Sequence, residues 1–217
     1  MSPLYVIAFT NEAGPPLHLG ERRIEFIEVS GIHVAVERVS DPPRLSEAAL
    51  REQHDLVMKI AERVEGVVPA RFGALLERQE LESLVSLRLD PIRKMLDHVA
   101  GRVQMTVRAF AAPRSLTPNR MRSQHGRETG TAYLQKRRRV SAAPLARDAV
   151  AVSRGVRHVV HDERTHAGSG RVGWTLYHLV DRQAVPEYIR AVEPFRSSSI
   201  VVSGPWPPFA FVSDLWS

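Results

Sequence analysis

The first forty residues carry the hydrophobic pattern of β-strands. Residues 4–9 form a short apolar run, and residues 24–27 are enriched in strand formers after a loop rich in Gly and Pro. Beyond Ser30 and Gly31, apolar side chains alternate with others over residues 32–37, so that one face of a strand can be buried while the other meets water. The pattern predicts a hairpin near the start of the chain.

The spacing of apolar residues then changes to that of an α-helix. Ser46 is suited to cap a helix that runs to about Glu65, with apolar residues recurring every three or four positions. Gln53 and His54 interrupt this apolar stripe. A histidine on the inner face of a helix is more often a hydrogen-bonded interface residue than a ligand or a base, and we expect that role for His54.

A second helical region covers residues 78–101. Asp90 and Pro91 fall inside it, and because proline suits only the first turn of a helix, we expect two abutting helices or one kinked helix. Residues 102–110 alternate again and predict a returning strand. This order of elements is close to that of a ferredoxin-like α+β sandwich, with helices on one face of a mostly antiparallel sheet. We assign residues 1–110 to such a domain.

The C-terminal half of the chain also predicts an α+β fold. Residues 111–130 are rich in Pro, Ser, Arg and Gly and predict a linker or loop. Residues 131–217 predict a smaller α+β domain, which begins with a long helical element that Pro144 interrupts. Its further expected elements are a short strand starting at Val159, a strand over 172–180, a helix over 183–192 and a strand over 200–202.

Composition narrows the class of protein. The chain of 217 residues is 43% hydrophobic and 25% charged, which suits one large or two small folded domains. It contains no cysteine, which excludes a disulfide framework, a thiolate metal centre and a cysteine nucleophile. No stretch approaches the roughly 18 apolar residues of a membrane span, and the N-terminus lacks a basic leader, so we expect a cytoplasmic protein without membrane contact.

The net charge of +6 is concentrated in one segment. Residues 112–147 hold nine basic residues and one acidic residue, so the rest of the chain is slightly acidic. The basic run 136–139, with Tyr133 nearby, favours phosphate binding, and a nucleic-acid-binding module using segment 114–147 is the alternative function. The stacking aromatics of an RNA-binding sheet are missing, which favours a solvated helical face that pairs with acidic groups.

No constellation of catalytic or metal-ligating residues stands out. His158, His161 and His166 are close in sequence but lack the spacing of a metal motif, and we interpret them as a solvated strand end. The glycines of segment 168–173 lack the strand before and the helix after that a dinucleotide site requires, so they predict a turn. We therefore expect no catalytic residues, no cofactor and no metal.

Two further segments have compositions that ordinary core or loop does not explain. VVPARFG, at 67–73, places Arg71 among buried residue types and predicts an extended segment whose guanidinium reaches inward or across domains. GPWPPFAFV, at 204–212, is stiffened by three prolines, so it either clamps its own domain or presents an apolar surface to a partner. The aromatic residues of this second segment are Trp206, Phe209 and Phe211.

Four blocks of the sequence together resemble the gas vesicle accessory protein family GvpF/GvpL. They are VVPARFG (67–73), GTAYLQKRRR (130–139), LYHLVDR (176–182) and GPWPPFAFV (204–212). The family stretches that they resemble are VLPxRFGT, GxAYLxRRR, AYLVDR and GPWPPYSF, in the same order. Ala74 departs from the usual threonine after RFG, and Pro91 and the long Arg-rich loop before Gly130 also depart from the family pattern. The ordered set covers the chain from end to end.

The resemblance implies a non-enzymatic protein of two α+β domains, the first ferredoxin-like, that is a minor structural or assembly component in gas vesicle formation. It implies association with the small, very hydrophobic shell protein and with other accessory proteins, in the cytoplasm and on the vesicle; self-association stays open. Residues expected to contact a partner are Trp206, Phe209, Phe211 and Arg71, with Arg137, Arg138 and Arg139 steering toward an acidic surface.

Overall fold

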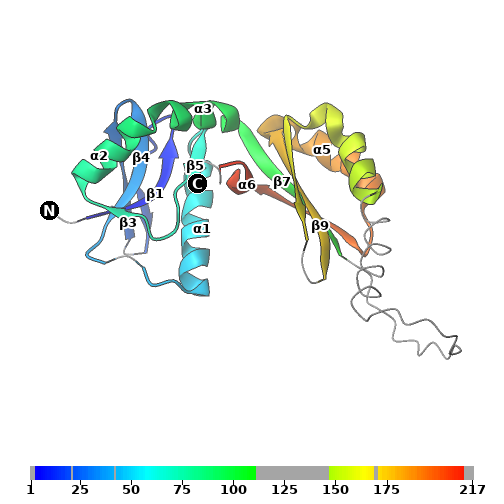
Figure 1. Cartoon of the computed structure of the whole chain (residues 1–217), viewed down its shortest axis with the longest axis horizontal. Coiled ribbons are helices and arrows are strands. Elements are labelled where there is room, and N and C mark those ends of the chain that lie inside the picture. The colour runs from blue at the N-terminus through cyan, green and yellow to red at the C-terminus, as the bar shows by residue number, and fades with distance from the viewer. Residues whose placement is uncertain (1–2, 21, 42, 111–146, 169–170, 213–217) are drawn as a thin grey trace, which may run out of the picture. The chain divides into compact units, whose positions relative to one another are not determined.

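The computed structural model describes residues 3–20, 22–41, 43–110, 147–168 and 171–212. Its strands are β1 (Leu4–Thr10), β2 (Leu17–Leu19), β3 (Arg22–Val29), β4 (Ile32–Arg38), β5 (Val67–Pro69), β6 (Leu75–Leu76), β7 (Arg102–Phe110), β8 (Asp162–Ala167), β9 (Val172–Asp181) and β10 (Ile200–Trp206). Its helices are α1 (Glu47–Ala61), α2 (Arg78–Leu87), α3 (Leu89–Val99), α5 (Val185–Val192) and α6 (Phe209–Val212), and residues 147–156 are also helical. Figure 1 shows the chain coloured from its N-terminus to its C-terminus.

The chain divides into two compact units. Unit 1 comprises Met1–Gln104, Leu179–Gln183 and Gly204–Ser217, and unit 2 comprises Met105–His178 and Ala184–Ser203. The sequence predicted domains over 1–110 and 131–217, whereas the structure groups the last part of the chain with unit 1. The physical reason is that apolar side chains of the C-terminal segment are buried in the core of unit 1.

Unit 1 is built on an antiparallel sheet with the strand order β2-β3-β4-β1-β5. β5 pairs with the second half of β1 and β6 pairs with its first half, so both strands lie along the same edge. The predicted hairpin is confirmed: β3 and β4 are joined at Ser30 and Gly31, which both have positive φ values, 52° and 77°. Two consecutive positive φ values are typical of the turns that match the twist of paired strands.

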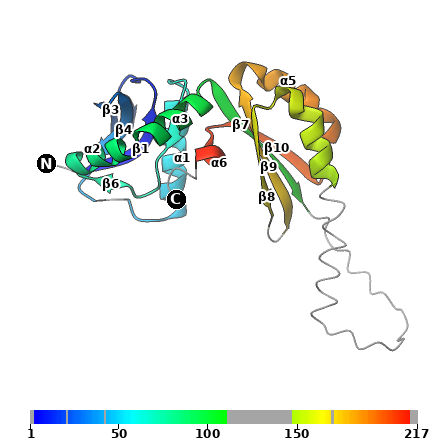
Figure 2. The same ribbon diagram turned by 45° about the horizontal axis from the view of Figure 1, so that its top comes forward.

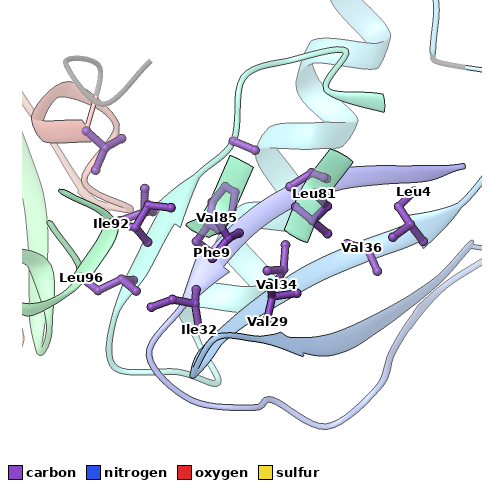
Figure 3. Packing of buried hydrophobic residues seen from close by; sticks show 14 of the residues in the cluster. Leu4, Phe9, Val29, Ile32, Val34, Val36, Leu81, Val85, Ile92 and Leu96 are labelled. Carbon is purple, nitrogen blue, oxygen red and sulfur yellow. The ribbon is translucent and has the colours of Figure 1, made fainter. Parts of the chain in front are cut away.

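Both faces of this sheet are buried. Phe9, Val34 and Val36 belong to a cluster that also contains buried residues of α2 and α3, and Figure 3 shows this packing. Ile7 and Ala35 belong to a second cluster with buried residues of α1. Every residue of β1 is buried, as an uninterrupted apolar run predicts for a strand covered on two sides.

This arrangement corrects the expectation of helices on one face. α2 and α3 cover one face and α1 covers the other, because β1 and β4 send apolar side chains in both directions. Alternation over residues 32–37 suggested a hydrated face, but Ala35 is fully buried and Glu37 forms an ion pair with Arg22 of β3. A small side chain and a paired carboxylate are both compatible with a covering helix.

The helix boundaries follow local sequence signals. The Ser46 hydroxyl accepts a hydrogen bond from the Ala49 backbone N–H at 3.1 Å, as predicted for an N-cap, although α1 ends at Ala61 rather than near Glu65. The expected break in the second helical region is confirmed as two abutting helices that meet at Arg88, with Pro91 in the first turn of α3.

The second sheet has the strand order β10-β7-β9-β8. In unit 2, residues 147–156 and α5 lie on the same side of these strands (Figures 1 and 2). The helical segment buries Val152 and Val156, and α5 buries Tyr188 and Val192. The short strand expected at Val159 is instead a 3-10 turn over Arg157–Val159, and β8 begins three residues later.

Candidate functional site

The C-terminal segment of the chain is part of the core of unit 1. Phe211 is 0% exposed, and Val212 belongs to the cluster under α2 and α3. The Gln104 side-chain oxygen accepts a hydrogen bond from the Ala210 backbone N–H at 2.8 Å, and α6 contacts β5. The segment GPWPPFAFV therefore packs into unit 1, whereas the predicted clamp acted on its own domain over 131–217. Because Phe211 is enclosed, it is not available to a partner in this conformation, which corrects its assignment as a contact.

His54 of α1 holds the same segment through its ring. The imidazole stacks on Phe209 with ring centres 5.2 Å apart and planes inclined by 21°, and it lies 5.7 Å from the ring of Trp206. His54 is half-buried, as are both aromatic residues. The interruption of the apolar stripe at His54 is thus explained by packing against residues more than 150 positions away in the chain. His54, Trp206 and Phe209 are called the aromatic clamp below.

A cavity of about 210 Å³ opens beside the aromatic clamp, entirely within unit 1. It is called the C-terminal cleft below. Its lining residues come from α1 and the turn after it, from β5, from the start of β7, from Arg182 and from the C-terminal segment. They are Met58, Ala61, Glu62, Glu65, Val67, Arg102, Val103, Arg182, Pro205, Trp206, Pro207 and Pro208. Four distant parts of the sequence meet here, which is why no local motif predicted the cleft.

The charged groups at this cleft differ in how they are held. The Arg102 guanidinium donates to the Asp181 carboxylate at 3.2 Å, and the Arg182 guanidinium donates to the Ala61 backbone carbonyl at 3.0 Å. The second bond places a positive charge at the C-terminal end of α1, where the helix dipole favours it. Glu62 and Glu65 are exposed. Two guanidiniums are thus fixed to the protein, while two carboxylates face water.

Arg71 lies in an interruption of the edge strand. Between β5 and β6, the Ala70 N–H donates to the Ile7 carbonyl and the Val6 N–H donates to the Ala74 carbonyl, so the strand resumes beyond a bulge that contains Arg71. Arg71 is exposed, which corrects the expectation that its guanidinium reaches inward. Gly73 has a φ of 81°, a conformation that favours glycine, and this accounts for the glycine of the RFG motif.

A buried polar network fixes this bulge to α1. The Tyr5 hydroxyl donates to the Gln53 side-chain oxygen, and the Gln53 amide donates to the Ala70 carbonyl at 3.3 Å. Burial raises the pKa of Tyr5 above its ordinary value, so the hydroxyl stays protonated and able to donate. Gln53, the second interruption of the apolar stripe of α1, is therefore a satisfied core residue.

Replacing Tyr5 with phenylalanine is expected to lower the free energy of unfolding by about 1–3 kcal/mol, because the buried Gln53 oxygen loses its donor. Urea denaturation followed by circular dichroism measures the loss. In the double variant Tyr5→Phe/Gln53→Leu only part of the stability should return, since the Gln53 oxygen left without a donor is removed but the buried Ala70 carbonyl loses the Gln53 amide as its donor. If Tyr5→Phe alone is as stable as the wild type, the hydrogen bond between Tyr5 and Gln53 does not contribute as proposed.

Sequence reasoning missed a second polar network, in unit 2. His178 of β9 is 0% exposed, and its two ring nitrogens lie 2.7 Å from the Tyr188 hydroxyl of α5 and 3.0 Å from a Glu163 carboxylate oxygen of β8. Burial lowers the pKa of His178, while the Glu163 carboxylate acts in the opposite direction. Burial also raises the pKa of Tyr188. The available signal was a histidine in the middle of the most apolar strand of the C-terminal half.

The lowered pKa of His178 predicts acid sensitivity. As the pH falls below about 6.5, the histidine of the unfolded chain takes up a proton that the folded chain resists, so stability should fall through this range and level off above it. Denaturation midpoints measured from pH 5 to pH 8 test this. In His178→Gln the dependence on pH should be shallower than in the wild type, whatever the absolute stability, and an equal slope would contradict the assignment.

The remaining predicted residues do not form a site in the part of the chain that the structure describes. Arg137, Arg138 and Arg139 lie outside the described residues. His158 lies 3.7 Å from a Glu187 oxygen, and His166 is an exposed residue of β8. Within the described ranges, no group of three or more His, Asp and Glu side chains is placed to hold a metal ion. The helices described there also include none with the length and hydropathy needed to cross a bilayer.

Solved structures of two gas vesicle proteins share the fold of this chain. The crystal structure of the gas vesicle protein GvpF from Microcystis aeruginosa matches with a TM-score of 0.78 over 98% of this chain and 100% of that chain, at 12% sequence identity. GvpF from Anabaena sp. PCC7120 matches with a TM-score of 0.78 at 12% identity, over 98% of this chain and 99% of that chain. At this identity the likeness shows a shared fold. No curated protein sequence matches the chain.

The sequence itself carries the stronger evidence of kinship. Residues 3–213 match the family model described as gas vesicle synthesis protein GvpL/GvpF. This range includes the RFG bulge, the aromatic clamp and the C-terminal cleft, so the match covers the residues that give unit 1 its distinctive features. The chain belongs to the gas vesicle synthesis protein GvpL/GvpF family.

Proposed function

We propose that this chain is a minor structural or assembly protein of gas vesicles that binds the small hydrophobic shell protein during nucleation or growth. The observation that carries the proposal is the family match over residues 3–213, which extends across both units. The family is one of gas vesicle proteins and not a known enzyme family. Its work would take place in the cytoplasm, where the vesicle forms.

Such a protein must contact the apolar shell protein before other shell protein molecules bury its exposed surface. A shell protein of high hydrophobicity exposes apolar surface and open strand edges until it is incorporated. A partner with a preformed apolar surface can hold it in solution and orient it for addition. Unit 1 offers such a surface at the C-terminal cleft, where Trp206 and three prolines form one wall.

The proposed contact residues are those expected from the sequence, without Phe211. Trp206 and Phe209 are half-buried and Arg71 is exposed, so each can contribute to a surface, whereas Phe211 is enclosed. Arg137, Arg138 and Arg139 are proposed to steer the chain toward an acidic partner surface through long-range attraction. An attraction of this kind weakens with salt, while apolar contact does not.

Co-purification tests the proposal. The tagged full-length chain is expressed with a gas vesicle gene set, the lysate is treated with nuclease before elution, and the eluate is examined for the shell protein and for other accessory proteins. The shell protein is expected to elute with the chain after nuclease treatment. Light scattering of the purified chain measures self-association in the same preparation.

The outcomes separate the two candidate functions. Shell protein that remains bound after nuclease supports the assembly role, and the variant Arg137→Glu/Arg138→Glu should then bind it more weakly at low salt. If nuclease removes all bound material and no shell protein is found, the assembly role is wrong. Nucleic-acid binding that falls steeply with salt would then support the alternative based on segment 114–147.

A further inference from the structure

We infer that the C-terminal cleft is the docking site for one apolar side chain of the shell protein, in a segment where a basic residue lies next to that side chain. This inference rests on the proposed function and adds the surface of this chain that performs it. It also specifies the chemistry of the partner segment: an apolar anchor for the cleft and a positive charge for its rim.

The cleft is formed in advance by rigid groups. Pro205, Pro207 and Pro208 fix the backbone of one wall, and Trp206 between them is held by the ring of His54. The end of α1 also lines the cleft, and there the Ala61 carbonyl accepts a hydrogen bond from Arg182. A site whose walls are already ordered loses little conformational entropy when a ligand enters, so a small contact area can give useful affinity.

The size of the cleft limits its occupant. Pockets for small molecules usually span about 300–1,000 Å³, and this one is about 210 Å³. The walls provided by Met58, Val67, Val103 and the Trp206 segment are apolar. Such a space accommodates a single aliphatic or aromatic side chain, and it lacks room for a helix. A hydrophobic anchor that enters a central pocket is a common source of affinity in protein interfaces.

The charged residues at the rim of the cleft indicate which charge the partner segment carries beside its apolar anchor. Arg102 is paired with Asp181, whereas Arg182 keeps its positive charge because the Ala61 carbonyl that accepts its hydrogen bond is neutral. The two carboxylates of Glu62 and Glu65 outnumber this one remaining positive charge in the lining. Glu62 and Glu65 are exposed at the same rim and point to a basic neighbour for the anchor. The complementary segment therefore has a Lys or Arg close in space to an apolar residue, and the two contacts together fix its orientation.

Photo-crosslinking locates the contact. A benzophenone amino acid replaces Glu62 at the rim of the cleft in one full-length variant. In a second variant it replaces Glu28, an exposed residue of β3 that does not line the cleft. Each purified variant is irradiated with the shell protein. Crosslinked shell protein is expected with the probe at position 62 and not with the probe at position 28.

Charge reversal tests the rim. Glu62→Lys/Glu65→Lys should bind the shell protein roughly tenfold more weakly at low salt, since two attractions become repulsions. The matched control Glu28→Lys/Asp55→Lys makes the same change of net charge at exposed positions that do not line the cleft, and it should bind like the wild type.

Ala61→Phe, which fills the cleft, should weaken binding by at least tenfold at any salt concentration. Thermal melting confirms that each variant is folded.

Failure of this inference is distinguishable from failure of the proposed function. If the shell protein binds the wild type but crosslinks only at position 28, or binds the folded Ala61→Phe and Glu62→Lys/Glu65→Lys variants with unchanged affinity, the cleft is not the docking site while the assembly role stands. If the wild-type chain does not bind the shell protein at all, the proposed function is wrong and the docking site falls with it.

Discussion

Replacing Phe211 with alanine is expected to lower the free energy of unfolding of unit 1 by about 3–5 kcal/mol. The Phe211 ring is 0% exposed. Its removal takes away the apolar contacts of the ring and leaves a cavity in its place. Because folded domains are only marginally stable, a loss of this size is a large fraction of the total. Urea denaturation monitored by circular dichroism measures it.

Phe209→Ala is the matched control for this prediction. Phe209 lies two residues earlier in the same short helix, but it is half-buried and stacks on His54 at the surface of the second cluster. Its removal should cost clearly less than that of Phe211. If Phe211→Ala costs less than about 1 kcal/mol, the segment is not part of the core. The predicted domain over 131–217, which kept this segment apart from the N-terminal domain, would then be the better description.

Both Ile7→Ala and Phe9→Ala are expected to destabilise unit 1 severely, by about 2–5 and 3–5 kcal/mol respectively. Ile7 belongs to the cluster under α1 and Phe9 to the cluster under α2 and α3, so the two variants probe opposite faces of β1. A sheet with helices on one face would leave one of these side chains in contact with water and its removal nearly harmless. Equilibrium unfolding in urea distinguishes the two arrangements.

An exposed residue serves as the reference for these variants. Leu87 at the end of α2 is 84% exposed, and Leu87→Ala should change stability by no more than about 0.5 kcal/mol. A loss confined to either Ile7→Ala or Phe9→Ala, with the other variant resembling Leu87→Ala, would contradict the covering of both faces. The result matters for function, because α1 provides one wall of the C-terminal cleft.

The end of the chain connects stability with the proposed function. Phe211 is buried and Val212 belongs to the core cluster under α2 and α3, and this anchoring positions the residues just before them, including Trp206, at the cleft. A segment held at one end by buried side chains and stiffened by proline presents its surface with little freedom. The same nine residues therefore both stabilise unit 1 and form the wall that is proposed to meet the shell protein.

The sequence by itself determined the features that depend on neighbouring residues. The apolar run of β1, the cap at Ser46 and the helix break near Pro91 were all predicted, because strand burial, capping and proline geometry act within a few positions. Family membership was also accessible, since four short blocks in a fixed order are characteristic even though the overall identity to the solved structures is 12%.

Only the tertiary structure decided which distant residues meet. Gln53 and His54 were visible as interruptions of the apolar stripe of a helix, but their partners, Tyr5 and Phe209, lie 48 and 155 positions away. Burial of Phe211, the network around His178 and the second covered face of the sheet likewise arise from contacts between segments remote in the chain. Periodicity shows that a side chain is suited to burial, but the packing of the whole unit decides what buries it.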